Sequence, residues 1–113
     1  MSDSTPSFKY YFAVWAPDYT DPEALNRRLA VRPQHLEGAR ALIEKGHIKV
    51  GGAMVTPETY QAEDVKMAGS VMIYSADSIE DVKSLIENDP YWVGNVWDKE
   101  KLSIMPFRPA KPL

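Results

Sequence analysis

Two histidines are the only imidazoles in this 113-residue chain, and their settings differ. His35 lies two residues after Pro33, in an apolar helical pattern that includes Leu36 and Ala39. We expect the helix to restart after the proline, which would put His35 in a first turn. There the positive end of the helix dipole disfavours imidazolium and leaves a neutral ring able to accept a proton. The alternative is a histidine at the edge of the core that satisfies a backbone carbonyl. His47 opens a strand pattern and is expected to be solvated.

Asp89 is followed by Pro90 and Tyr91, and two roles fit it. Asp before Pro is typical of a helix N-cap, a contact worth about 1 kcal/mol. A carboxylate can also orient an imidazole, which fixes its tautomer and raises its basicity. Spacing alone does not tell whether Asp89 reaches His35, so both interpretations stay open here. The neighbouring Tyr91 and Trp92 are expected to pack rather than to stack on a substrate.

Arginines flank the first histidine. A solvated helix face is the simplest interpretation of Arg27, whereas Arg32, next to Pro33, could face a pocket and clamp a carboxylate. Phosphate loops, dinucleotide fingerprints, serine elbows and H-E-x-x-H are all missing from the sequence. The histidines and carboxylates lack metal-ligand spacing, so the sequence predicts no metal site and no cofactor.

Six elements would have to position these residues. Aromatic and β-branched runs predict strands over 8–16, 47–54, 69–76 and 102–107, and periodic apolar residues predict helices over 21–45 and 78–88. Asp21 is the expected N-cap of the first helix, Pro33 should kink or restart it, and Gly46 should end it. Ser78 begins a capping box. The order β-α-β-β-α-β predicts an α+β, ferredoxin-like fold, a four-stranded antiparallel sheet with two helices on one face.

Both faces of the predicted sheet are apolar. In the first strand Phe12 and Val14 point one way while Tyr11, Ala13 and Trp15 point the other. Because two short helices cover only one face, the other would be an exposed patch that needs a partner. We expect a homodimer that packs sheet against sheet. The alternative is a monomer in which loops and the Pro-rich tail cover that face.

Composition and length further narrow the partners, the location and the domain organisation that we expect. The net charge of −3 argues against nucleic acid as a partner, since phosphate neutralisation needs a basic face. No apolar run approaches a membrane span, and 1–7 resembles no secretory signal. Zero cysteines suit a reducing compartment, so we expect a cytoplasmic location. The length fits a single domain over 1–113, with a flexible N-terminus at 1–7 and a Pro-rich tail at 108–113.

Three stretches resemble the YciI family, the bacterial YCII-domain proteins: 28–36 with its R-P-x-H sequence, Ala68-Gly69-Ser70-Val71, and Asn88-Asp89-Pro90-Tyr91 followed by the strand to Phe107. The resemblance spans about residues 10–109. It implies a ferredoxin-like fold in the dimeric α+β barrel group, related to muconolactone isomerase-like proteins. The chain departs from the family pattern at Ala53, where the family usually has a proline after the glycine of the second strand.

The resemblance also implies a site. The family's His–Asp pair falls on His35 and Asp89, and two substrate-contact positions fall on Ser70 and Arg32. Relatives include a dehydrochlorinase that acts on a chlorinated hydroxyquinol. With the resemblance added, we favour a small-molecule lyase or isomerase in which His35 is the general base and Asp89 orients it. The competing hypotheses are a dimeric module that binds a small ligand without transforming it, and a purely structural partner of another protein.

Overall fold

The computed structural model describes residues 8–113, so the expected flexible segment 1–7 lies outside the described residues. Four strands, β1 (Tyr10–Pro17), β2 (Ile48–Val55), β3 (Met67–Ala76) and β4 (Ser103–Phe107), form one sheet in the order β2-β3-β1-β4, and every neighbouring pair is antiparallel. Helices α1 (Ala24–Glu44), α2 (Ile79–Glu87) and α3 (Pro90–Val93) connect them. The predicted ferredoxin-like α+β fold is confirmed.

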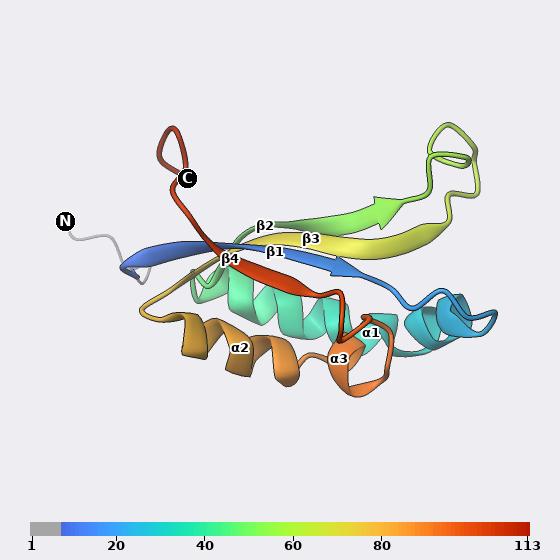
Figure 1. The fold of residues 1–113 in the computed structure, drawn as a ribbon, viewed down its shortest axis with the longest axis horizontal. Coiled ribbons are helices and arrows are strands. Elements are labelled where there is room, and N and C mark those ends of the chain that lie inside the picture. Colours follow the sequence, from blue (N-terminus) through green and yellow to red (C-terminus); the bar gives the residue numbers. More distant parts are fainter. Residues whose placement is uncertain (1–7) are drawn as a thin grey trace.

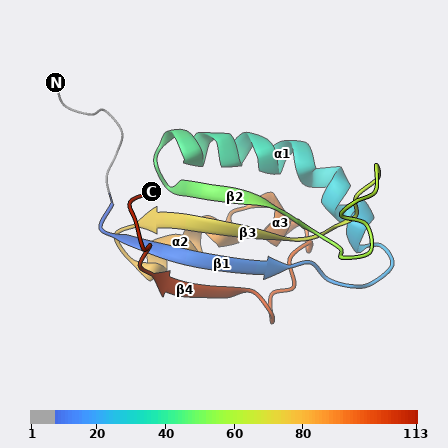
Figure 2. The ribbon, with the colours of Figure 1, turned by 90° about the horizontal axis from the view of Figure 1, so that it is seen from above.

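All three helices lie on the same side of the sheet, as Figure 1 shows. In the view from above, α1 runs along the β2 edge while α2 and α3 lie beneath the central strands (Figure 2). Strand alternation places the core between these layers: Phe12, Val14 and Ala16 of β1 are buried against the helices, whereas Trp15 is 55% exposed on the opposite face. The predicted facing of β1 is therefore confirmed.

Helix α1 differs from its prediction at its start and does not restart after Pro33. It begins at Ala24, and no side chain caps it at Glu23. The Asp21 carboxylate accepts the Glu23 N–H at 3.2 Å within the turn that precedes the helix. The helix runs unbroken through Pro33 to Glu44, and its axis bends (Figure 2), as the alternative of a kink predicted. His35 therefore lies in the middle of α1 and not in a first turn, so the helix-dipole argument for a neutral imidazole was wrong.

Helix ends follow local sequence more closely. Gly46 has φ 85° just after α1, the left-handed conformation that glycine adopts most easily. The Ser78 hydroxyl accepts the Asp81 N–H at 3.1 Å, which confirms half of the predicted capping box. The element that the six predicted ones did not include is α3, a single turn with Asp89 as its N-cap, which is one of the two roles that the sequence left open for Asp89.

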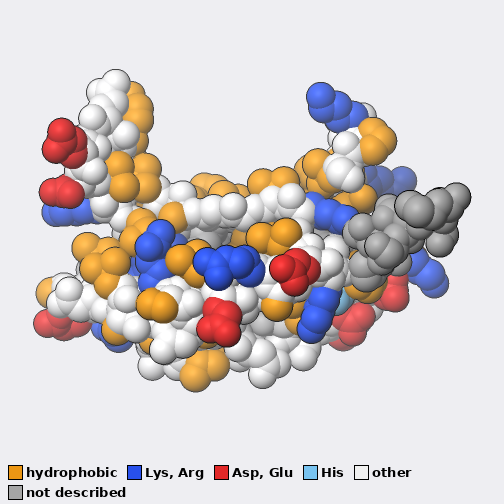
Figure 3. All heavy atoms as spheres, turned by 180° about the vertical axis from the view of Figure 1, so that it is seen from behind, with side chains coloured by type: hydrophobic (Ala, Val, Ile, Leu, Met, Phe, Trp, Pro, Cys, Tyr) orange, Lys and Arg blue, Asp and Glu red, His pale blue; other side chains and the backbone are white. Residues whose placement is uncertain are grey.

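The face of the sheet away from the helices is open among residues 8–113. Trp15, Val71, Met105 and Phe107 are exposed apolar side chains on it. The hairpin loop 56–66 and the tail 108–113 rise from opposite ends of this face and leave a trough between them (Figures 1 and 3). No helix within residues 8–113 is long and apolar enough to cross a membrane.

Candidate functional site

His35 and Asp89 meet beneath the sheet although 54 positions separate them in the chain. His35 Nδ1 lies 2.8 Å from Asp89 Oδ1 and 3.1 Å from Oδ2, and both side chains are largely shielded from solvent. A carboxylate only accepts hydrogen bonds, so Nδ1 carries the proton and donates it. The neutral ring then has its free lone pair on Nε2, which makes no hydrogen bond with residues 8–113.

Asp89 occupies this position because it begins α3. Its Oδ1 accepts the Tyr91 N–H at 2.8 Å while it also accepts from His35. Capping fixes the carboxylate relative to the backbone of α3, since the N-cap side chain satisfies a free helix N–H. The two roles that the sequence left open for Asp89 thus coexist on one oxygen atom.

Aromatic rings hold the imidazole from the side. The Tyr91 ring stacks on His35 with centroids 3.8 Å apart and an interplanar angle of 14°. Trp97 meets both rings edge-on, at 6.0 Å from His35 and 5.6 Å from Tyr91. Tyr91 and Trp97 are fully buried, so these contacts restrict the imidazole to one orientation.

A cavity of about 310 Å³ lies between α1 and the β2–β3 part of the sheet, and His35 forms part of its wall. Asp89 does not line it, so the carboxylate supports the imidazole from behind. The floor includes Gly51, where an added Cβ would sit 3.4 Å from Ile48 and 3.6 Å from Met72. The remaining wall is mostly apolar, and this volume is at the small end of the range for ligand sites in proteins.

Arg28 is a buried cation at the end of this cavity. Only 2% of it is exposed, and its Nη1 donates to both oxygens of the buried Asp18, at 2.8 and 3.0 Å. Its guanidinium also lies over the Tyr91 ring, 4.5 Å from the centroid, and its Nη2 donates to Ser70 Oγ at 3.1 Å. Burial raises the pKa of the Asp18 carboxyl, and the charge and hydrogen bonds of Arg28 partly oppose this rise.

Ser70 joins the cavity to the core. Its hydroxyl oxygen accepts from Arg28 Nη2 and, at 3.2 Å, from Trp97 Nε1. Two accepted hydrogen bonds occupy both lone pairs, so the Ser70 O–H remains available only as a donor. Because Ser70 lines the cavity, this donor can serve a bound molecule.

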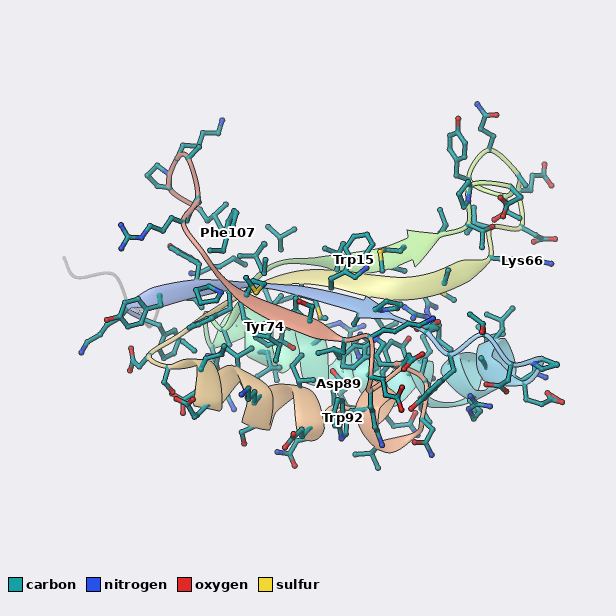
Figure 4. All side chains as sticks on the ribbon, in the orientation of Figure 1. Trp15, Lys66, Tyr74, Asp89, Trp92 and Phe107 are labelled. Carbon is teal, nitrogen blue, oxygen red and sulfur yellow. The ribbon has the colours of Figure 1, made fainter. Side chains whose placement is uncertain are left out.

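Tyr74 is a second buried polar group near the pair (Figure 4). Its hydroxyl is buried and makes no hydrogen bond among the described residues. Burial raises the pKa of the Tyr74 phenol, and the negative charge of Asp89 raises it further. Tyr74 therefore stays neutral and contributes packing under β3.

The structure brings the sequence-predicted residues to one place. His35, Ser70 and Arg32 line the cavity, and Asp89 lies behind His35. Arg28 was overlooked as a site residue, although it lies seven positions before His35 and four before Arg32, a spacing typical of one helix face. The expectation of a solvated His47 was wrong: its Nδ1 lies 2.8 Å from the Ser75 carbonyl oxygen, away from the cavity.

Metal ligation has no support in the described part of the chain. Among residues 8–113, no three His, Cys, Asp or Glu side chains lie close enough together to hold a metal ion. The polar side chains that line the cavity are instead arginine, serine, histidine and tyrosine.

Comparison with known proteins agrees with this arrangement of motifs. The YCII-related domain matches residues 11–108. The chain is 32% identical over 97 residues to fusaric acid biosynthesis protein 2 of Gibberella fujikuroi, a match that covers 86% of this chain and 91% of the relative. It is 29% identical to the protein YciI of Escherichia coli, covering 86% and 95% of the two chains.

A solved structure is similar in fold and in sequence. It is the 5-chloro-2-hydroxyhydroquinone dehydrochlorinase of Burkholderia phenoliruptrix, in complex with 2,5-dihydroxybenzoquinone. The TM-score is 0.73 with 26% sequence identity, and the match covers 87% of this chain and 93% of that one. Together with the match over nearly the whole sequence, this shows that the chain belongs to the YCII-related domain family.

Proposed function

We propose that the protein is a small-molecule lyase or isomerase in which His35 is the general base. The observation that carries the proposal is the His35–Asp89 contact at the cavity wall. Nδ1 is occupied by Asp89, so the basic Nε2 is the nitrogen left for a ligand. A base placed in this way contributes about 10²–10⁴-fold in rate.

The proposed step is proton abstraction. Nε2 takes a proton from a carbon or hydroxyl of the bound molecule, and the released electron pair forms a double bond as a leaving group departs with its own bonding pair. In an isomerase the imidazolium returns the proton to another atom of the same molecule. The Asp89 carboxylate stabilises the imidazolium formed in between. Arg32 and Ser70 would contact the substrate. The similar dehydrochlorinase supports the lyase form of the step.

The test compares the two histidines as a matched pair. Purified protein is assayed for chloride release from 5-chloro-2-hydroxyhydroquinone, the compound that names the similar structure. We expect His35→Ala to lose about 10²–10⁴-fold in turnover. His47→Ala is the control, because His47 lies outside the cavity. Full turnover by His35→Ala would remove the assigned role.

The same assay decides between catalysis and binding. Binding of 2,5-dihydroxybenzoquinone, followed by protein fluorescence, together with no chloride release from 5-chloro-2-hydroxyhydroquinone would favour the module that holds a ligand unchanged. His35 and the arginines that line the cavity would then act only in recognition. Chloride release that depends on His35 rejects that alternative.

We further propose that the protein acts as a homodimer through the open face of the sheet. Trp15 and Met105 are 55% and 61% exposed there, more than a monomer needs to leave uncovered. The hairpin loop carries Glu58, Glu63 and Asp64, and the tail at the other end of the face carries Arg108 and Lys111. A two-fold axis across the long direction of the sheet would pair each acidic loop with the partner's basic tail.

A further inference from the structure

The charged side chains that line the cavity all carry the same sign. They are Arg28, Arg32 and Arg40, and no Asp or Glu of the described chain lines it. The charge of Arg28 is matched by the buried Asp18. Arg32 and Arg40 make no ion pair and no hydrogen bond with residues 8–113. Two exposed positive charges without a protein counter-ion therefore border the cavity. The same two arginines also line a groove on the outer side of α1.

Arg32 and Arg40 stand on the same face of α1, eight residues apart, which is about 12 Å along the axis. Leu36 lies midway between them and also lines the cavity. Long arginine side chains can converge on one group between them. Glu37 borders the groove on the outer side of the helix, but it is not within ion-pair distance of either arginine. Figure 3 shows the molecule from behind, the side on which α1 lies in Figure 2, and there basic and hydrophobic side chains intermingle.

Hydrogen-bond donors also outnumber acceptors at the cavity. Ser70 has both lone pairs occupied and offers only its O–H. Arg28 Nε is buried without an acceptor among the described residues. The side-chain acceptors left at the cavity wall are His35 Nε2 and the Tyr91 hydroxyl, which can also donate. A molecule that fits this set has several acceptor oxygens and one proton to give.

The apolar walls of the cavity indicate what the rest of the ligand is like. Leu36, Ala39, Ile43 and Met72 line the cavity, and the absence of a side chain at Gly51 keeps its floor open. A volume of about 310 Å³ suits a body about the size of one ring. The apolar body and the donor-rich rim lie within the same cavity, so one ligand can use both.

We infer that the cavity binds a small organic oxyanion, a carboxylate or enolate on an apolar body, with the anionic oxygens held by Arg32 and Arg40. This inference rests on the proposed function for the orientation of the ligand, whose acidic proton then faces His35. It names a substrate class, since neutral and cationic molecules of the same shape leave the two arginines unpaired.

The experiment measures binding of two probes of the same shape, benzoate and neutral benzamide, by calorimetry. We expect benzoate to bind about tenfold tighter, a difference of about 1.4 kcal/mol, because hydrogen bonds to a charged group are stronger than those between neutral groups. The double variant Arg32→Gln/Arg40→Gln should remove that preference. Arg27→Gln is the matched control, since Arg27 is on the same helix but pairs with Asp21 outside the cavity.

A steric variant shows that the binding takes place in the cavity. Gly51 has an ordinary backbone conformation, so Gly51→Val is compatible with β2 and fills the floor. We expect Gly51→Val to weaken binding of both probes. The inference is overturned by equal affinities for benzoate and benzamide, by no detectable benzoate binding, or by an equal loss in Arg27→Gln. No step of the measurement involves turnover, so its failure is distinct from a failure of His35 as a base.

Discussion

His35 Nδ1 and Asp89 Oδ1 lie 2.8 Å apart, and the same carboxylate oxygen accepts the Tyr91 N–H at 2.8 Å. One atom of Asp89 therefore orients the imidazole and begins the helical turn that carries Tyr91, the ring stacked on that imidazole. Asp89 thus both caps α3 and orients His35, and substitutions of Asp89 can separate these two roles.

Asp89→Asn should separate capping from charge. The amide oxygen can take the place of Oδ1 and accept both N–H groups, and Asn is as good an N-cap as Asp, so the free energy of unfolding should change by less than about 1 kcal/mol. Turnover should fall about tenfold, because a neutral amide stabilises the imidazolium less than a carboxylate does. Chemical denaturation and the chloride assay measure the two effects. Unchanged turnover would leave Asp89 as a cap alone.

Arg28 and Asp18 should behave as one buried unit. Asp18→Asn leaves the Arg28 charge buried without its partner and should cost about 3 kcal/mol or more of unfolding free energy. Replacing both residues by apolar ones, Asp18→Leu/Arg28→Met, should cost much less than the sum of the single changes. A double-mutant cycle in urea measures the coupling. Additive effects would mean that the ion pair does not act as a unit.

Asp21 should titrate abnormally because of Arg27. Hydrogen bonds from Arg27 hold the pKa of the Asp21 carboxyl down at about 2, below the usual 3.8. A lowered folded-state pKa means that the ionised carboxylate favours the folded state above about pH 4. This contribution is lost as the pH falls through 2. Carboxyl NMR measures the midpoint, which should return toward 3.8 in Arg27→Gln. An unmoved midpoint would exclude Arg27 as the cause.

Trp15→Glu should dissociate the proposed dimer. The substitution places a charge in the centre of the open apolar face, where a second copy would have to desolvate it. Val93→Glu is the control, since Val93 is 67% exposed on α3, on the other side of the molecule. Sedimentation equilibrium over a range of protein concentrations measures the mass. A monomeric wild-type chain, or equal dissociation by Val93→Glu, contradicts the proposed interface.

Local interactions account for the parts of the fold that were predicted. Alternation along β1 set which side chains face the core, Gly46 ended α1, and the Ser78 hydroxyl capped α2, each through contacts within a few residues. The start of α1 was placed too early because residues 22 and 23 form a turn before the helix. In that turn the Asp21 carboxylate also binds Arg27, a partner that a capping pattern does not reveal.

The amino-acid sequence by itself determined the order of the elements, the two-sided apolar sheet and the pair of residues that a family resemblance points to. Only the tertiary structure decided that His35 and Asp89 touch, that Arg28 is buried against Asp18, and that Arg32 and Arg40 face one cavity. The physical reason is the separation along the chain between the residues that interact. Turns, caps and alternation depend on near neighbours in the chain, whereas a buried ion pair or a shared cavity exists only after distant elements have packed together.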